Sequence, residues 1–528
     1  MILTLITLLA VLASAAVAAK RCVNALHMWQ MDSYIGSRYI AWLAAKPRER
    51  FLDLRSLAVA FSVFAASWLF PVLLVVWIAY CAYRLFERES QEAKKPFDYT
   101  DRAKRTLLVA RILVAAAAVP LGLALSPEGA MLAAAGLVHA APGAVLLANV
   151  LLKPVHAHIN RGFVQAASRR IAQLKPIVVG IAGSYGKTST KYFTETLLAE
   201  RFNVIKSPGN YNTLLGITRV VNDMLTPDHQ VFIAEMGAYK RGEVREIADL
   251  VHPRIGIIAS IGPEHFERFL SMDNIERTNY ELVEALSADG LAVFNGENEH
   301  CRKLAAQTRH TRVALYGLDN RRGDCDLWAE EIEHGPDGLR FTMATKDRAR
   351  IQITAPIVGR HMVLNILGAA RIALELGVTL EEVARAAPKL RSAPNRLELK
   401  KGAAGTIIID DSYNSNPIGA SEALHVLSQF KTGRRILVTP GMIELGELHY
   451  LKNEEFGFEA AQSCDFAILV GPEQTRPIQD GLRRGGFPEN SQRVVKDLAE
   501  ATALFQKLLR PGDVLLFEND LPDLYSEK

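Results

Sequence analysis

The chain has 528 residues, 49% of them apolar and 22% charged, with a net charge of +4. This length predicts three or four domains, and so small a net charge, without Lys/Arg blocks among aromatic residues, argues against nucleic acid as a partner. Five cysteines without a CxxC pair indicate neither a zinc site nor a disulfide framework.

Long Ala, Leu and Val runs fill the first 152 residues. Because a helix needs roughly 20 apolar residues to cross a bilayer, the runs predict about four membrane spans. These are Ile2–Ala19, Leu57–Tyr83, Leu107–Leu125 and Ala130–Leu152. No basic residue precedes the first run, which favours an uncleaved anchor over a signal peptide. We therefore predict a transmembrane helical region over residues 1–152 and a juxtamembrane helix or linker over residues 153–174.

The orientation of these spans is ambiguous. Lys20–Arg55 and Arg84–Arg105 each contain seven Lys or Arg residues, so both favour the cytoplasm. Four simple crossings cannot place both loops there. Either the first loop is external, or Leu57–Tyr83, with Pro71 near its middle, enters the bilayer and returns to the same side. Basic residues after the last span predict that the rest of the chain is cytosolic: Lys153, Arg161, Arg169, Arg170 and Lys175.

The next segment joins a strand to a helix through a glycine-rich turn. Ile177–Ala182 is a short β-rich apolar run, and Lys191–Arg201 has helical character. Between them, "GSYGKTST" has the chemistry of a phosphate-binding loop: Gly183 and Gly186 bend the backbone so that its N–H groups reach phosphate oxygens, Lys187 supplies positive charge, and the Thr188 hydroxyl suits Mg²⁺. The strict GxxxxGK[ST] pattern needs glycine where Ile181 stands, so a plain flexible turn is the alternative.

Two further predicted strands end in polar residues. "VFIAEMGA" ends in Glu235, a potential Mg²⁺ ligand, and "RIGIIASIGPEHF" leads to His265, a potential second metal ligand or base. Each residue in isolation is more typical of a surface or structural role. Because ligands collect at the carboxyl edge of a parallel sheet, their combination with Lys187 and Thr188 predicts a nucleoside triphosphate site there.

Eight segments between Lys175 and Gly471 resemble, in order, the Mur ligases, and most closely the type that adds D-alanyl-D-alanine to the muramoyl tripeptide. They are "GSYGKTSTK" (Gly183–Lys191), "SPGNYNTLLGI" (Ser207–Ile217), "EMGAYKRGEV" (Glu235–Val244), "SIGPEHFERF" (Ser260–Phe269), "GRHMVLNILGAARIALELG" (Gly359–Gly377), "NRLE" (Asn395–Glu398), "DDSYNSNP" (Asp410–Pro417) and "GMIELGE" (Gly441–Glu447). The resemblance implies an α/β soluble part behind the transmembrane region. Residues 175–392 would form a P-loop, Rossmann-like central ATP-binding domain and residues 393–528 a Rossmann-like C-terminal domain.

The resemblance also implies roles for individual residues. ATP would be bound by Gly183, Ser184, Gly186, Lys187, Thr188, Ser189, Asn365, Arg396 and Asp411. Mg²⁺ would be held by Thr188, Glu235 and His265, the last at a second ion. The carboxyl substrate would be approached by Asn210, Asn212 and Thr213, and the amine by Asn414 and Asn416. Lys187, His265 and Arg396 would act in catalysis.

The implied reaction joins a carboxylate to an amine. The carboxylate attacks the γ-phosphorus of ATP to form an acyl phosphate, and the amine then displaces phosphate. The expected partners are membrane lipid, a UDP-linked or lipid-linked peptidoglycan precursor, and an amino acid or dipeptide.

The chain departs from the family at several positions. The family's carbamylated, metal-bridging lysine corresponds to Asn279, or to Arg277 if the alignment shifts by two, and neither can form that carbamate. The second metal would then be held differently, with help from Glu281, or more weakly. Gly441 replaces a usual Asp, and the C-terminus lacks the family's Lys-Gly-Ser-Arg run.

Membrane spans also stand where soluble relatives have a domain for the UDP end of the acceptor. This predicts either a lipid-linked acceptor or a membrane-localised ligase for soluble precursors. A poly-gamma-glutamate-type ligase and, because of Asn279, a non-catalytic ATP-binding membrane scaffold are the alternative functions.

Overall fold

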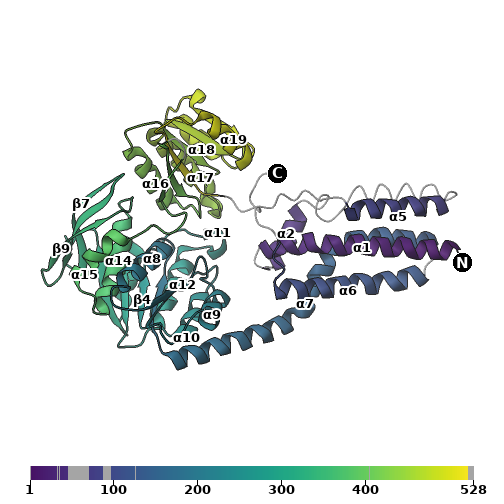
Figure 1. The fold of residues 1–528 in the computed structure, drawn as a ribbon, viewed down its shortest axis with the longest axis horizontal. Helices are drawn as coiled ribbons and strands as arrows, with labels where there is room; N and C mark the ends of the chain where they lie inside the picture. Colours follow the sequence, from purple (N-terminus) through teal and green to yellow (C-terminus); the bar gives the residue numbers. More distant parts are fainter. Residues whose placement is uncertain are drawn as a thin grey trace. The chain divides into compact units, whose positions relative to one another are not determined.

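The computed structural model describes residues 2–31, 34, 36–45, 70–86, 97–124, 127–402 and 405–520. The chain forms two compact units, Met1–Arg161 and Gly162–Lys528 (Figure 1). Only the second contains strands among the described residues.

The first unit is helical. Its helices are α1 (Ile2–Met31), α2 (Gly36–Ala45), α5 (Phe70–Phe86), α6 (Asp101–Ala124) and the first part of α7 (Pro127–Leu174). Trp29 of α1 stacks on Tyr39 of α2 with ring centroids 4.6 Å apart inside this unit, while leucines such as Leu108 and Leu147 face outward.

Within the described residues, two helical stretches are long and apolar enough to cross a membrane, Ile2–Met31 and Gly136–Leu174. Leu74–Phe86 is apolar but shorter. Residues 57–69 of the second predicted span, and Leu125 of the third, lie outside the described part of the chain. The predicted fourth span and juxtamembrane segment form one uninterrupted helix, α7, despite Pro142 and Pro154.

The second unit begins with a nine-stranded sheet of order β2-β3-β1-β4-β5-β6-β7-β8-β9. The strands are parallel from β2 to β7, and β8 and β9 extend the sheet as antiparallel strands. Their bounds are β1 (Ile177–Ala182), β2 (Val204–Lys206), β3 (Val231–Glu235), β4 (Ile255–Ile258), β5 (Leu291–Asn295), β6 (Arg312–Gly317), β7 (Leu327–Gly335), β8 (Gly338–Thr345) and β9 (Arg350–Ala355).

Helices cover both faces of this sheet, as expected for parallel strands that are apolar along their whole length. Alternation along β1 sends Val179 and Ile181 into one core and Val178 and Ala182 into the other. The first core contacts α8 (Lys187–Leu198), α14 (Met362–Glu375) and α15 (Leu380–Ala386). The opposite face carries α9 (Leu214–Asp223), α10 (Glu243–Val251), α11 (Phe266–Phe269), α12 (Met272–Glu284), α13 (Glu299–Gln307) and the end of α7.

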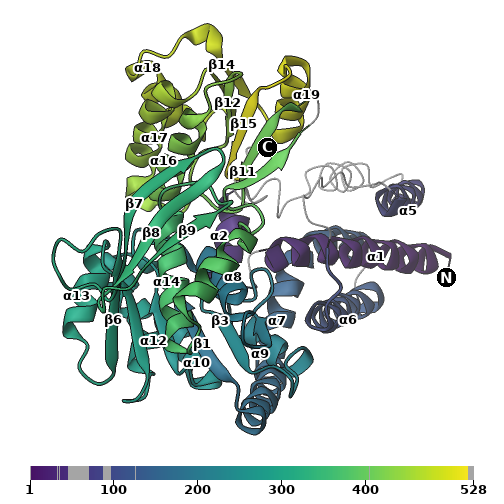
Figure 2. The same ribbon diagram turned by 60° about the vertical axis from the view of Figure 1, so that its left-hand side comes forward.

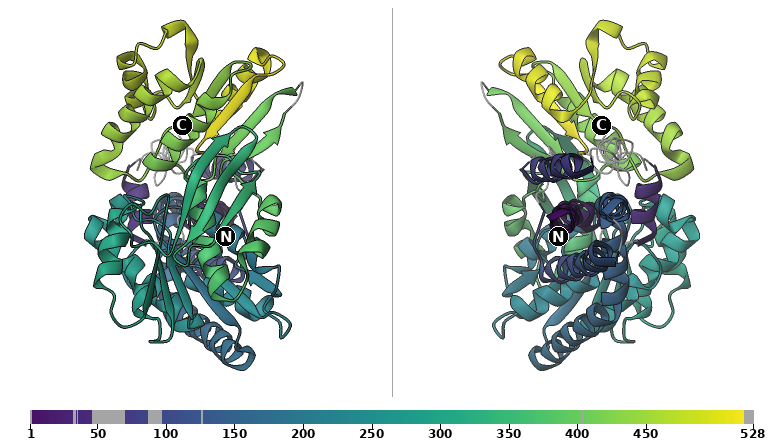
Figure 3. Two further views of the ribbon diagram at one scale, coloured as in Figure 1. Left: turned by 90° about the vertical axis from the view of Figure 1, so that its left-hand side faces the viewer. Right: turned by 90° about the vertical axis from the view of Figure 1, so that its right-hand side faces the viewer.

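A second, six-stranded sheet follows in the order β10-β11-β15-β12-β13-β14, and only β10 is antiparallel (Figure 2). Its strands are β10 (Glu398–Lys401), β11 (Ile407–Asp411), β12 (Arg435–Thr439), β13 (Phe466–Val470), β14 (Gln492–Val495) and β15 (Val514–Glu518). Its helices are α16 (Pro417–Gln429), α17 (His449–Ser463), α18 (Arg476–Arg484) and α19 (Leu498–Leu508), with α19 on the opposite face from the other three (Figure 3). The two largely parallel sheets confirm the predicted α/β class.

Candidate active site

The sheet order places the three strand ends predicted to carry the site side by side, because β1 lies between β3 and β4. The loop after β1 packs closely against its neighbours. Gly183 has φ +136° and Gly186 has φ +81°. A Cβ at Gly183 would lie 2.9 Å from the Ser260 carbonyl oxygen, and one at Gly186 would lie 2.5 Å from Asn365 Oδ1. Only glycine meets both the conformational and the steric requirement at these positions.

Lys187 begins α8 and points back over this loop. Its Nζ donates to the carbonyl oxygens of Gly183 and Ser184, at 2.5 and 2.8 Å, and forms an ion pair with Glu264 Oε2 at 2.9 Å. The ammonium group therefore lies where the backbone N–H groups of a helix start and a glycine turn favour anions. A phosphate entering here would replace Glu264 as the partner of Lys187.

Thr188 and Glu235 bring two hard oxygen donors together. Thr188 Oγ1 donates to Glu235 Oε1 at 3.2 Å, and the amide of Asn212 also donates to that oxygen at 3.3 Å. Glu235 is buried at the end of β3. A hydroxyl and a carboxylate oxygen are ligands that Mg²⁺ accepts alongside phosphate oxygens and water. These residues fit the first predicted Mg²⁺ ion.

The loop after β4 is tied to the phosphate-binding loop. Ser184 N donates to the Ser260 carbonyl at 2.7 Å, and Ser184 Oγ exchanges hydrogen bonds with the Gly262 backbone at 2.9 and 3.1 Å. This loop delivers Glu264 to Lys187, and His265 next to it. Ser184 thus helps to shape the site, whereas Ser189 is buried inside α8.

His265 contacts the C-terminal domain. Its Nδ1 pairs with Glu444 Oε2, and Arg268 Nη2 holds the other oxygen of Glu444 at 3.0 Å. Tyr239 packs on both the His265 ring and the Arg268 guanidinium. Burial opposes ionisation of Glu444, but His265 and Arg268 more than offset it and lower the pKa of this carboxyl to about 2. We refer to His265, Arg268 and Glu444 as the domain latch.

The residues expected near a second metal ion contact protein groups in the described part of the chain. Asn279 uses both ends of its amide, because Oδ1 accepts from Gly183 N at 2.7 Å and Nδ2 donates to Ile275 O at 2.9 Å. Glu281 accepts from the backbone N–H groups of Gly242 and Arg245 at the start of α10. In the part of the chain that the structure describes, no three His, Cys, Asp or Glu side chains form a potential metal cluster.

Asn279 supports the phosphate-binding loop, Glu281 stabilises a helix start, and Arg277 pairs with Asp273 on the exposed side of α12. His265, predicted to hold the second ion, pairs with Glu444, and its role toward a metal stays a prediction.

The junction between the domains carries Arg396 between two residues with left-handed backbone, Asn395 (φ +59°) and Leu397 (φ +44°). Arg396 Nη1 donates to the Asn414 carbonyl oxygen at 3.1 Å, and its guanidinium lies 4.4 Å from the centre of the Tyr413 ring. Asp411 accepts from the N–H group of Leu397 at 3.1 Å. The predicted C-terminal nucleotide residues thus form one connected group.

Asp411 also belongs to a buried pair of acids. It lies opposite Glu518 in the β11–β15 register, and Ser415 Oγ donates to Glu518 Oε1 at 2.5 Å. Burial raises the pKa of Asp411 to about 6, although Arg396 opposes the change. Burial and then the charge of Asp411 raise the pKa of Glu518 well above its usual value. The pair therefore retains a proton at pH values where free carboxyls have lost theirs.

We expect Glu518→Gln to stabilise the protein at alkaline pH. Raised folded-state pKa values mean that the native pair loses stability as the pH rises from about 4 through 6 and beyond, and an amide at position 518 cannot ionise. Thermal unfolding should show Glu518→Gln melting about 2–4 °C above the unsubstituted protein at pH 8, for a gain of roughly 1 kcal/mol, with no difference near pH 4. An equal shift at both pH values would contradict the shared-proton interpretation.

Some of the predicted substrate residues cap helices, and others contact the site or the C-terminal domain. The side chains of Thr213 and Asn416 cap helices, accepting from Gly216 N at 3.3 Å and Gly419 N at 2.9 Å. Asn212 reaches the site through Glu235, and Asn210 interacts with Tyr413 of the C-terminal domain. Asn365 lies against Gly186, and Thr190 Oγ1 approaches its Oδ1 at 3.4 Å.

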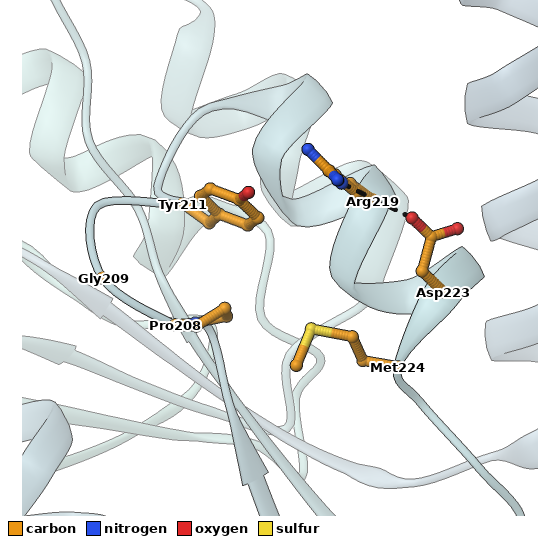
Figure 4. A pocket seen from close by; sticks show the side chains of 6 residues that line it. All are labelled: Pro208, Gly209, Tyr211, Arg219, Asp223 and Met224. Atoms are coloured by element: carbon orange, nitrogen blue, oxygen red, sulfur yellow. Dashed lines mark ion pairs between the residues drawn. The ribbon is translucent and has the colours of Figure 1, made fainter. Parts of the chain in front are cut away.

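The loop Ser207–Thr213, here called the acceptor loop, also borders a pocket of about 380 Å³ (Figure 4). The pocket is lined by Pro208, Gly209, Tyr211, Arg219, Asp223 and Met224. Arg219 and Asp223 of α9 face each other across one turn at 3.5 Å. None of the phosphate-site residues lines this pocket.

The sequence did not predict the residues that form ion pairs with the predicted site residues. Glu264, Lys191 and Glu444 all lie in the quoted segments, but their spacing does not reveal that they pair with Lys187, Glu235 and His265. Glu518 was recognisable only as part of an altered C-terminus.

Comparison with known proteins covers both domains. Residues 181–373 match the Mur ligase middle domain, and residues 395–518 match the family described as "Mur ligase, glutamate ligase domain". The UDP-N-acetylmuramoyl-tripeptide–D-alanyl-D-alanine ligase of Mycobacterium bovis is 31% identical over 369 residues, covering 64% of this chain and 69% of the relative. The Escherichia coli K12 protein of the same name is 28% identical over 303 residues, covering 57% and 66%.

Solved structures resemble the same region. A crystal structure of MurF from Acinetobacter baumannii superimposes with a TM-score of 0.61 at 25% identity, covering 68% of this chain and 77% of that one. MurF from Thermotoga maritima in complex with ADP shares the fold, with a TM-score of 0.59 at 21% identity over 69% of this chain and 81% of that one.

Proposed function

Because the chain belongs to the Mur ligase family, and is therefore an ATP-dependent ligase that forms a peptide bond, we propose that it extends a peptidoglycan precursor at the cytoplasmic membrane. The acceptor is a muramoyl peptide with a free carboxylate, and the amine is D-alanyl-D-alanine or a similar dipeptide or amino acid. The observation that carries this proposal is the meeting of Lys187, Thr188 and Glu235 at the ends of β1 and β3.

In the first step, an oxygen of the acceptor carboxylate attacks the γ-phosphorus of ATP, and ADP leaves. Two anions must approach each other, so the site needs positive charge and donors at the phosphate. Lys187 and the backbone N–H groups at the start of α8, residues 186–188, would supply them. A Mg²⁺ ion held by Thr188 and Glu235 would add charge neutralisation at the phosphates.

In the second step, the amine nitrogen attacks the carbonyl carbon of the acyl phosphate, inorganic phosphate leaves with the former carboxylate oxygen, and the nitrogen loses a proton. Asn414 and Asn416, on the loop after β11, belong to the domain that would present the amine. Water would destroy the acyl phosphate, so the domains must be closed during this step. The latch of His265, Arg268 and Glu444 supports that requirement.

We also propose that the helices of residues 1–161 anchor the ligase in several passes, with the catalytic domains in the cytosol. The two apolar stretches Ile2–Met31 and Gly136–Leu174, and the outward-facing leucines, support anchoring. An anchored ligase could receive a UDP-linked acceptor or one attached to a polyprenyl lipid.

A substrate panel tests the proposal. Purified full-length protein in detergent is given ATP and Mg²⁺ with UDP-linked or lipid-linked muramoyl tripeptide, each with and without D-alanyl-D-alanine or single amino acids, and phosphate release is measured. We expect release that needs both an acceptor and an amine. Turnover of the UDP form only would end the lipid-linked hypothesis. Repeated addition of glutamate would favour the poly-gamma-glutamate alternative, and ATP binding without turnover in every combination would favour the scaffold.

A further inference from the structure

Lys191 lies one helical turn beyond Lys187, on the buried side of α8, and its side chain is completely inaccessible to solvent. Its Nζ forms an ion pair with Glu235 Oε2 at 2.8 Å and donates to the carbonyl oxygen of Gly209 at 2.9 Å. One buried cation therefore contacts both the end of β3 and the middle of the acceptor loop. Burial of a lysine is costly unless its charge is paired. Here Glu235 supplies the counter-charge, and the Gly209 carbonyl oxygen accepts a hydrogen bond.

We infer that Lys191 is a positioning residue, which holds the acceptor loop in register with the carboxylate of Glu235. The inference rests on the proposed function for the identity of the loop's ligand, but not for the contacts themselves.

The two carboxylate oxygens of Glu235 have different partners, which supports this role. Lys191 takes Oε2, while Oε1 faces Thr188 Oγ1 at 3.2 Å and the Asn212 amide at 3.3 Å. Because Lys191 fixes one oxygen, the other stays directed at the nucleotide side of the site. Without the ammonium group, Oε2 would lose its counter-charge, and only the longer contacts of Thr188 and Asn212 with Oε1 would orient the carboxylate.

The acceptor loop is joined to β3 at further points. Ser207 N donates to the Ile233 carbonyl at 2.9 Å, Glu235 N donates to Ser207 Oγ at 3.3 Å, and Gly237 N donates to the Asn212 carbonyl at 2.7 Å. These bonds hold the two ends of the loop. Lys191 holds its middle through Gly209, which has a left-handed φ of +50° and no side chain to anchor it.

Amide hydrogen exchange on the full-length protein tests the inference without any acceptor. We compare the unsubstituted protein with Lys191→Met, with Lys191→Met/Glu235→Gln, and with Lys303→Met. Lys303 is the matched control, because it also pairs with a buried carboxylate, Glu276 at 2.7 Å, but lies on α13. Removing a charge-assisted hydrogen bond should speed exchange in residues 209–213 about tenfold or more in both Lys191 variants and leave it unchanged in Lys303→Met.

The double variant separates positioning from folding. Lys191→Met leaves Glu235 buried without its counter-charge and should lower the unfolding temperature, whereas Lys191→Met/Glu235→Gln removes both charges and should regain most of that loss. The loop should nevertheless still exchange fast in the double variant, because Gly209 lacks its donor. Two results would overturn the inference. One is slow exchange of the acceptor loop in Lys191→Met, and the other is a double variant in which slow exchange returns together with stability.

Kinetic measurements with the acceptor substrate extend the test to the proposed function. With the acceptor that supports turnover in the substrate panel, Lys191→Met should raise the acceptor KM about tenfold and the KM for ATP much less. An unchanged acceptor KM would contradict the assignment of this loop. Fast loop exchange with no turnover on any acceptor would keep Lys191 as the anchor of the loop and refute the proposed substrate.

Discussion

Replacing Lys187 by Ala should lower turnover by about a thousandfold or more, because it removes the cation that faces the transferred phosphate. The loss has a second component. Lys187 neutralises Glu264 at 2.9 Å, and both side chains are largely buried. In Lys187→Ala the unpaired carboxylate of Glu264 would repel the nucleotide, so nucleotide affinity should fall together with turnover.

Two further variants separate these components. Lys187→Ala/Glu264→Gln should regain much of the nucleotide binding, measured with a fluorescent ADP analogue, but not the turnover. Lys389→Ala is the control for loss of a paired lysine, since Lys389 forms an exposed ion pair with Glu200 at 2.5 Å, and it should leave both properties unchanged. A Lys187→Ala protein that keeps more than about a tenth of the turnover would contradict the placement of the phosphate site.

The second large effect is expected at the domain latch. Glu444→Ala removes the carboxylate that holds His265 and Arg268, and the C-terminal domain loses a charged contact with the loop that carries Glu264. Misplacement of reacting groups by about 1 Å costs roughly a hundredfold in rate, so we expect turnover to fall about a hundredfold. Nucleotide affinity should stay within about twofold, because Lys187, Thr188 and Glu235 are untouched.

Glu447→Ala is the matched control for the latch. Glu447 lies three residues further along the same loop, is exposed, and its loss should not affect turnover. Because the pKa of Glu444 is held at about 2, its carboxylate stays charged throughout the pH range of an assay, so protonation of Glu444 itself should not change turnover between pH 6 and pH 8. Weakened nucleotide binding with normal turnover at saturation would contradict the latch.

The sequence predicted the parts of the fold that depend on periodicity. Apolar runs of four to six residues predicted β1, β3 and β4 as strands of one parallel sheet with their polar ends at the same edge. The adjacency of β3, β1 and β4 comes from the structure. The continuity of α7 was not predicted, because the apolar run ends at Leu152 and basic residues follow, a change in composition that a helix can nevertheless cross.

Side-chain partners were less predictable for a physical reason. Lys191 and Glu235 are 44 residues apart, and His265 and Glu444 are 179 residues apart, so no local spacing connects them. Asn279 illustrates the same limit. The sequence shows that Asn279 stands where the family has a lysine. The hydrogen bond from Gly183 N to Asn279 depends on how α12 packs beside β1. The roles of Asn365, Arg396 and Asp411 toward a nucleotide remain proposals.

The central claim is that ATP activates a carboxylate through an acyl phosphate at the Lys187 site. Its most direct test uses the acceptor identified in the substrate panel, labelled with ¹⁸O in the reacting carboxylate, and mass analysis of the phosphate released. The proposed chemistry predicts one ¹⁸O atom in each phosphate, because the oxygen that attacks the γ-phosphorus leaves with it. Phosphate without the label, released in step with amide formation, would contradict the account.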